Sequence, residues 1–313
     1  VWWANHTGLP ESWRATIENE ISKQGAHIKI GALSYLPFRG VAASEVRVYS
    51  DAAHEHEISR LERVLLDFDK TKLARGIVHI TKIELKNAGL TLPVNPNDPD
   101  SDALEVTDGN GTLLMPGGRR LEIRNAVGNI EGIKVALDAR LIGYQQEGEK
   151  KSDDTQMGKR RELLAKVIGE LKKWRFSADH PPEIRVMLEG DANQSSSLTA
   201  KFRLLARGIE KNQHELTDLT AEAEISGDLL TVTSLHAEDA RGRLDGHLDF
   251  DIGDREGRFD LHSSLELPLL LKAWAGLPPL RDIVIGGGQN LDAEGEFKLG
   301  ENNIPQVHMT GSA

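Results

Sequence analysis

Apolar residues fall on alternate positions over most of the segment 228–265 of this 313-residue chain. The residues on the apolar side of each predicted strand are Leu235, Ala237, Leu244, Gly246, Leu248, Phe250, Phe259, Leu261, Ser263 and Leu265. Asp, Glu, Arg and His occupy most of the positions between them. Successive side chains of a β-strand point to opposite faces, so the segment predicts strands with one apolar and one polar face. Such a sheet must be covered by a second layer or bend around something apolar, and this choice decides what the chain can do.

The same alternation continues on both sides of this segment. Further strands are predicted around Ile28–Ile30, Val46–Val48, Val64–Phe68, Ile77–Lys86, Leu90–Val94, Leu113, Leu121–Ile123, Ile133–Leu141, Ile184–Leu188, Leu198–Leu204, Leu219–Ile225 and Leu291–Leu299. Spacings of about 8 to 15 residues suit antiparallel hairpins and leave no room for the crossover helices of a parallel sheet. A slip in the period between Ile80 and Ile83 predicts a β-bulge or a bend, and Gly117-Gly118 predicts a hairpin turn.

Two longer segments have a helical period instead. Leu9, Trp13, Ile17 and Ile21 recur every four residues, so residues 10–24 are predicted to form an amphipathic helix. Residues 154–175 predict a second, basic amphipathic helix, which we expect to dock on the sheet or, alternatively, to lie on a membrane surface. Shorter helical turns are expected at 70–76 and 268–275.

These patterns predict an α+β fold that is mostly β. We expect a long twisted antiparallel sheet curled into a groove or taco, with the N-terminal amphipathic helix and the second helix near 154–175. Three regions are predicted: an N-terminal region at 1–150, a basic helix and linker at 151–180, and a repetitive antiparallel β region at 181–313. Both ends of the chain have the character of cuts in a longer polypeptide, and we expect the last region to be truncated.

Composition excludes several classes of function. The chain has 49 acidic and 38 basic residues and a net charge of -11, which argues against a nucleic-acid binder because neutralising phosphates requires a basic surface. It has no cysteine, so thiol catalysis, cysteine-ligated zinc and disulfides are excluded. No apolar run is long enough to cross a bilayer. Trp2 and Trp3 resemble the interfacial belt that ends a membrane-spanning helix, so we expect them to be membrane-proximal.

One motif has a catalytic interpretation. Residues 67–71 read Asp-Phe-Asp-Lys-Thr, which matches the D-x-D-x-T signature of haloacid dehalogenase phosphatases, where the first Asp is the nucleophile and the second a general acid. That chemistry depends on a doubly wound parallel sheet, whereas another strand is predicted about ten residues downstream. We therefore expect no catalytic residues and a protein that is not an enzyme.

Three further motifs suggest ligands but also have simpler interpretations. Asp98, Asp100 and Asp102 alternate as in a calcium loop, although Gly109 stands where an EF-hand has glutamate, and an acidic turn is the simpler interpretation. His54 and His56 could share one side of a strand as metal ligands, but no third ligand can be assigned. Residues 286–288 are three glycines without the following Lys-Ser/Thr of a phosphate loop. The sequence predicts neither a metal nor a cofactor.

Several segments together resemble the AsmA-like family of envelope proteins, the group that includes TamB and YhdP. The resemblance rests on residues 9–25, on 28–31, on 40–48 and on the run from Leu73 to Leu92, which includes an I-x-x-I-x-L unit. Residues 242–246 and 292–295 are similar to the repetitive strands of the same group. The shared features are apolar and glycine positions, and they touch most of the chain.

This resemblance implies a non-enzymatic periplasmic protein, anchored to the inner membrane through an N-terminal segment absent from this chain. It would act in lipid handling or outer-membrane biogenesis by holding a phospholipid or another acyl-chain ligand in an open groove. The residues expected to line the groove are Leu244, Leu248, Phe250, Phe259, Leu261 and Leu265. The same side chains could instead pack into a closed core. The alternative function is a periplasmic scaffold or assembly factor that binds envelope protein partners through its sheet edges.

Overall fold

The computed structural model describes most of the strands and the first helix of the chain. The residues that it describes are 9–22, 27–37, 39–49, 53–55, 57–93, 103–117, 119–143, 173–177, 179–191, 194, 197–265, 290–300 and 305–312. The predicted helices at 154–175 and 268–275, the acidic loop at 95–102 and the glycines at 286–288 lie largely or wholly outside these residues.

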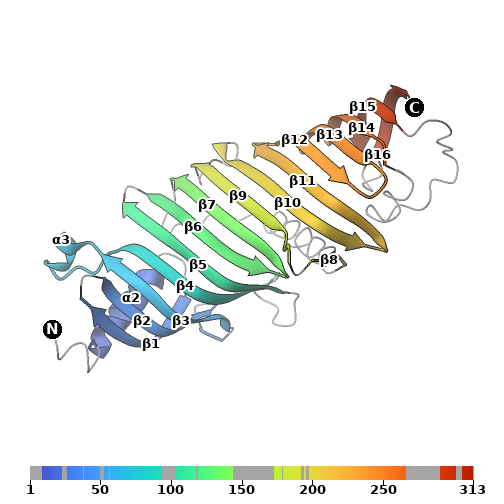
Figure 1. The fold of residues 1–313 in the computed structure, drawn as a ribbon. Helices are drawn as coiled ribbons and strands as arrows, with labels where there is room; N and C mark the ends of the chain where they lie inside the picture. Colours follow the sequence, from blue (N-terminus) through green and yellow to red (C-terminus); the bar gives the residue numbers. More distant parts are fainter. Residues whose placement is uncertain are drawn as a thin grey trace. The chain divides into compact units, whose positions relative to one another are not determined.

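Two helices and sixteen strands are formed by the described residues (Figure 1). The helices are α2 (Glu11–Ser22) and α3 (Lys70–Leu73). The strands are β1 (His27–Leu36), β2 (Gly40–Tyr49), β3 (Glu57–Phe68), β4 (Ile80–Pro93), β5 (Ala103–Gly117), β6 (Arg120–Ile130), β7 (Ile133–Ile142), β8 (Arg175–Phe176), β9 (Glu183–Asp191), β10 (Thr199–Lys211), β11 (His214–Ser226), β12 (Leu229–Glu238), β13 (Arg243–Asp251), β14 (Glu256–Ser263), β15 (Leu291–Leu299) and β16 (Pro305–Ser312).

The strands form one antiparallel sheet in which neighbours in sequence are neighbours in space. The order runs from β1 to β16, with β9 following β7 and the short β8 pairing beside β10. The sheet is not closed, since β1 and β16 stand at its two ends. The predicted mostly-β fold, with an antiparallel meander and an N-terminal amphipathic helix, is therefore confirmed. No helix in the described part of the chain is long and apolar enough to cross a bilayer.

The chain divides into two compact units. Unit 1 comprises residues 1–131, 135–170 and 191–193, and unit 2 comprises residues 132–134, 171–190 and 194–313.

Unit 1 has a core between α2 and the first strands. Ile17 and Ile21 lie on the buried side of α2, as their four-residue spacing predicts, and they pack against β1 to β4. The fully buried Leu66 and Ile80 belong to the same cluster, and Leu9 and Trp13 cover its margin. This end of the sheet is thus covered by a second layer.

Local features of unit 1 follow the sequence closely. Phe68 pairs with Ile80 and Asp67 with Lys82, so Thr81 is the extra residue of the predicted β-bulge. Gly117, with a φ of 89°, pairs with Arg120 across the predicted hairpin turn. The turn predicted at 70–76 begins with the four-residue α3.

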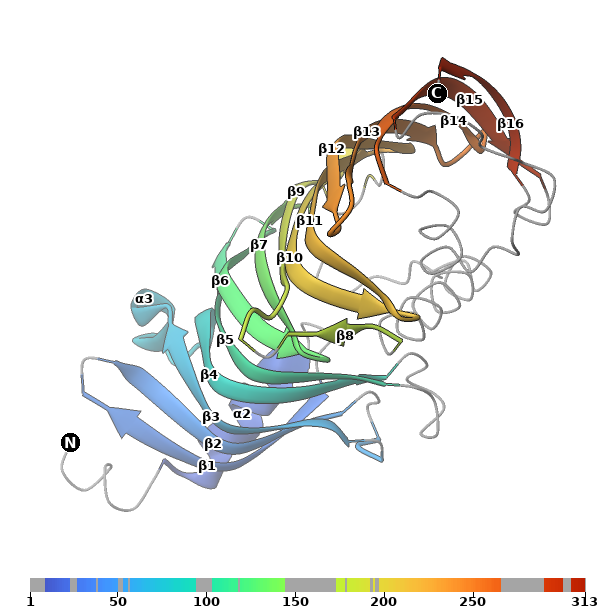
Figure 2. The ribbon, with the colours of Figure 1, turned by 45° about the vertical axis from the view of Figure 1, so that its right-hand side comes forward.

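Unit 2 is a run of hairpins in which β9 to β16 follow one another. The strands bend along their length, most visibly β10 and β11 in Figure 2. No described helix belongs to this unit. Its two sheet faces differ strongly in chemistry, since one is mostly apolar and the other mostly charged or polar.

Candidate functional site

One face of unit 2 is apolar from strand to strand. Three rows of directly paired residues cross β12 to β16: Leu230–Phe250–Gly257–Phe297–Val307, Val232–Leu248–Phe259–Gly295–Met309, and Leu235–Gly246–Leu261–Ala293–Gly311. We call the surface made by these rows the apolar face. Its members alternate mostly with polar or charged residues along the strands, and the antiparallel register brings them together.

At one end of the strands the apolar face is packed. Leu216, Ala237, Leu244 and Leu265 form a buried cluster, against which Leu219, Leu235 and Leu261 lie. Leu244 is 6% and Leu265 is 7% exposed. This end has the character of a closed core.

At the other end the apolar face carries three phenylalanines. The rings of Phe250 and Phe297 are stacked, with centroids 5.6 Å apart and planes 8° from parallel, and Phe259 lies 6.4 Å from Phe297. Gly257 separates the first two in the register, and a Cβ there would come within 2.5 Å of the Phe297 ring. Glycine at this position therefore lets the two rings meet above the strand.

The aromatic end is more open than the aliphatic end. Phe250, Phe259 and Phe297 are half-buried, and the last strand of the face exposes 52% of Val307 and 56% of Met309. An apolar ligand could reach these side chains, whereas Leu244 and Leu265 are already covered by protein.

The opposite face of unit 2, which we call the polar face, carries several ion pairs between neighbouring strands. Arg258 Nε lies 3.0 Å from Glu296 Oε1, and Lys298 pairs with Glu256. His236 Nδ1 lies 2.7 Å from Asp245 Oδ1, and His262 Nδ1 lies 2.5 Å from Asp292 Oδ1. The hydrogen bond with Asp292 raises the pKa of His262. Its charged side chains favour contact with water.

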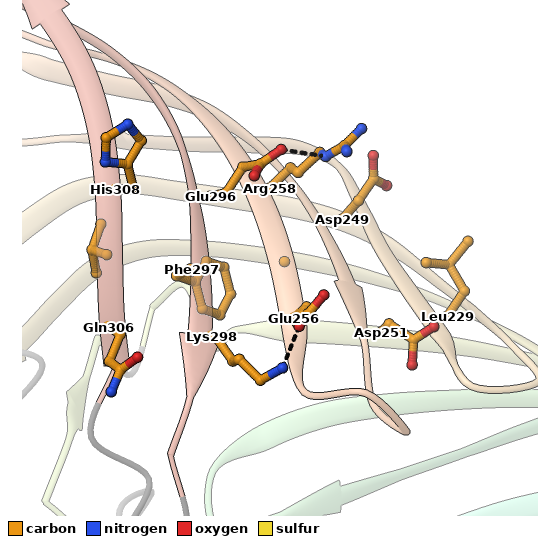
Figure 3. A pocket seen from close by; sticks show the side chains of 12 residues that line it. Leu229, Asp249, Asp251, Glu256, Arg258, Glu296, Phe297, Lys298, Gln306 and His308 are labelled. Carbon is orange, nitrogen blue, oxygen red and sulfur yellow. Dashed lines mark hydrogen bonds and ion pairs between the residues drawn. The ribbon is translucent and has the colours of Figure 1, made fainter.

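A hollow of about 500 Å³ that is open to solvent lies at the charged rows of β13 to β16 (Figure 3). Its charged and polar lining comes from two rows of the register, Asp249–Arg258–Glu296–His308 and Asp251–Glu256–Lys298–Gln306, and Leu229, Gly257, Phe297 and Val307 complete it. Figure 3 shows both ion pairs inside the hollow. Thr231 donates a 2.8 Å hydrogen bond to Asp249, which lowers the pKa of Asp249. The acids and bases here largely satisfy one another.

The structure places five of the six predicted groove residues in two adjacent strands. Leu244, Leu248 and Phe250 lie on β13, and Phe259 and Leu261 lie on β14. Leu248 pairs directly with Phe259. Leu265 follows β14 and lies in the packed cluster with Leu244. Trp2 and Trp3, predicted to be membrane-proximal, lie outside the described residues.

The site residues predicted from the sequence did not include Phe297, Val307 and Met309. Phe297 stands in an alternating run that the sequence does show, but its partner strand β14 ends well before β15 begins, at Ser263 against Leu291. Only the register reveals that Phe297 stacks on Phe250 and that β16 extends the apolar face.

Asp69 of the D-x-D-x-T motif has a structural role. Asp69 is the N-cap of α3, and its carboxylate accepts hydrogen bonds from the backbone N–H groups of Thr71 and Lys72. The bond from Lys72 contributes most to lowering the pKa of Asp69. The antiparallel sheet also differs from the doubly wound sheet on which dehalogenase chemistry depends. Within the described ranges no three His, Asp or Glu side chains are grouped so as to hold a metal ion, and His56 and residues 98–102 lie outside those ranges.

Comparison with known proteins identifies no relative: no family model, no curated protein and no solved structure matches the chain.

Proposed function

We propose that this chain is a non-enzymatic lipid-handling protein of the cell envelope that holds acyl chains against the apolar face of unit 2. The observation that carries the proposal is the aromatic end of that face, where three half-buried phenylalanines and the exposed Val307 and Met309 form one apolar surface. We propose that it acts in the periplasm, anchored to the inner membrane, with a role in lipid transport or outer-membrane biogenesis.

The physical chemistry of the apolar face suits acyl chains. Each methylene removed from water contributes about 0.8 kcal/mol, so a chain of ordinary length gains several kcal/mol from partial burial. The three rows contain only apolar side chains and glycine, so they offer no side-chain hydrogen bond that would fix a ligand in one position. The polar face supplies the charge that keeps such a sheet in water. The resemblance to AsmA-like proteins supports the same function.

The test is native mass spectrometry, with lipid extraction, on protein purified from a Gram-negative host. We expect co-purifying phospholipid in the original chain and its loss in Leu248→Asp, because a buried carboxylate opposes an acyl chain in the centre of the apolar face. Leu229→Asp is the matched control, since Leu229 is 47% exposed and pairs with Asp251 on the polar face.

Folding of each variant is checked by far-ultraviolet circular dichroism. Lipid retained by Leu229→Asp and lost by Leu248→Asp supports the proposal. A lipid-free original chain, or equal retention in the two variants, contradicts it.

A second candidate function is a scaffold that pairs with a client strand. The observation that favours it is β16, whose only strand partner among the described residues is β15 and whose Val307 and Met309 are exposed. An edge strand presents unpaired backbone groups to other chains. Addition of a client peptide that protects β16 amides from hydrogen exchange would support this function. Unchanged exchange would oppose it.

A further inference from the structure

The antiparallel register of unit 1 brings three turns to the same end of its strands. Leu36 pairs with Gly40 at the β1–β2 turn, Phe68 with Ile80 at the β3–β4 turn, and Gly117 with Arg120 at the β5–β6 turn. The first two turns are adjacent, since a Cβ on Gly40 would lie 2.5 Å from the Leu66 carbonyl oxygen. Figure 1 shows α3 of the second turn at the ends of β3 and β4.

These turns are rich in basic residues. Arg39, Lys70, Lys72, Arg75, Arg119 and Arg120, which we call the basic rim, are all exposed. At the opposite end of the same strands the described turn residues are 53–55 and 131–132, and these include two glutamates but no lysine or arginine. The described turns at the two ends of these strands therefore differ in charge, within a chain whose net charge is -11.

The positive charge of the rim is available to a partner. None of its six side chains forms an ion pair with a carboxylate of the described residues. The nearest acid in sequence is Asp69, whose carboxylate already accepts two backbone N–H groups at the start of α3. Arg119 donates one hydrogen bond, of 3.3 Å, to the carbonyl of Gly143.

An apolar side chain stands among these charges. Ile77 lies in the same turn as Lys70, Lys72 and Arg75, and it is 55% exposed. A phosphate-lined surface of anionic phospholipid attracts lysine and arginine while its acyl boundary accepts an apolar side chain. A nucleic-acid backbone attracts the same basic residues but has no comparable place for isoleucine. This combination favours a membrane surface over a nucleic acid.

The start of α2 lies toward the same end of the strands. Leu9 N donates a 2.9 Å hydrogen bond to Leu33 O. Leu33 lies in the second half of β1, which ends at Leu36. Leu9, just before α2, therefore contacts β1 a few residues before the turn that carries Arg39.

We propose that the basic rim docks unit 1 on the surface of a bilayer that contains anionic phospholipid, with Ile77 reaching into the boundary between headgroups and acyl chains. The inference rests on the proposed function for its compartment, the periplasmic surface of the inner membrane. Its binding chemistry comes from the rim alone, so docking at the rim and lipid holding on the apolar face can fail separately.

The test is flotation of the full chain with two kinds of vesicle, one of pure phosphatidylcholine and one with about a third phosphatidylglycerol. Each basic residue near an anionic surface strengthens partitioning roughly fivefold, so the triple variant Lys70→Gln, Lys72→Gln, Arg75→Gln should bind phosphatidylglycerol vesicles about 100-fold more weakly. Raising the salt concentration should weaken binding of the original chain.

The matched control removes three basic residues from other parts of the sheet, as Lys29→Gln, Lys86→Gln, Lys134→Gln. This control has the same net charge as the rim variant, but its three substitutions lie outside the basic rim, so it should keep binding within a few-fold of the original chain. Equal losses in the two triple variants, or equal binding of the original chain to both kinds of vesicle, would overturn the proposal. Co-purified lipid, measured by native mass spectrometry, should be the same in both triple variants, which separates this test from that of the apolar face.

Discussion

Gly257→Ala is the substitution that most directly tests how the aromatic end of the apolar face is built. The new Cβ would stand 2.5 Å from Cζ and 2.6 Å from Cε1 of Phe297, and 2.8 Å from the carbonyl oxygen of Asp249. The Phe297 ring must therefore leave its stack with Phe250, and the backbone of β13 must move slightly.

The magnitude follows from three contributions to the free energy of unfolding. Loss of the ring stack removes about 1 kcal/mol. Overpacking against the ring and the Asp249 carbonyl costs about 2 kcal/mol. Alanine regains roughly 0.5 kcal/mol, because glycine is unfavourable within a strand. We expect a net loss of about 2.5 kcal/mol.

Urea unfolding followed by far-ultraviolet circular dichroism measures this loss, and a second background isolates its cause. In Phe297→Ala the ring is absent, so Gly257→Ala should cost less than about 1 kcal/mol there, from the Asp249 contact alone. An effect below about 0.5 kcal/mol in the original chain, or the same cost in both backgrounds, would refute the reasoning.

Two other substitutions test single hydrogen-bonded sites. Asp69→Ala should lower the free energy of unfolding by about 1 kcal/mol in a urea titration, because the cap of α3 is lost. Asp69→Asn can still cap and should lower it much less. If the chain instead released phosphate from p-nitrophenyl phosphate and Asp67→Asn abolished that release, the dehalogenase interpretation would be supported. Because the pKa of His262 is raised in the folded state, its stabilising effect is complete below the ordinary value of 6.5 and is lost as the pH rises through the folded value. The stability difference between the original chain and His262→Gln should thus be larger at about pH 5.5 than at about pH 8.5, and a difference independent of pH would contradict the assigned pair with Asp292.

The sequence was sufficient for the strands because burial on one face imposes a period of two. The shift in apolar parity between Ile80 and Ile83 also predicted a bulge or bend there, since one extra residue in a strand has this effect, and the register assigns the extra residue as Thr81. The helix at α2 was equally accessible, because Ile17 and Ile21 must face the core together.

Contacts between side chains on different strands were harder to predict from the sequence. Leu248 and Phe259 were both predicted as groove residues from the alternation within their strands, and the register shows that they pair directly. The stack of Phe250 on Phe297 was not, because it depends on register between strands far apart in sequence and on the missing side chain of Gly257. The role of Asp69 in the D-x-D-x-T match at 67–71 could not be read from the sequence, because an aspartate that caps a helical turn looks there like one that carries out chemistry; the structure shows that Asp69 caps α3.

The meander has an evolutionary consequence. Apart from the pairing of β8 with β10, the described strands hydrogen-bond only to the strands before and after them in the sheet, so a hairpin could be duplicated or deleted with repair needed only at its two flanking strands. A chain of this design can change its length in increments of one hairpin, while the alternation inside each new strand automatically extends both faces. Gene duplication could thus lengthen the apolar surface without any change to the strands already in place.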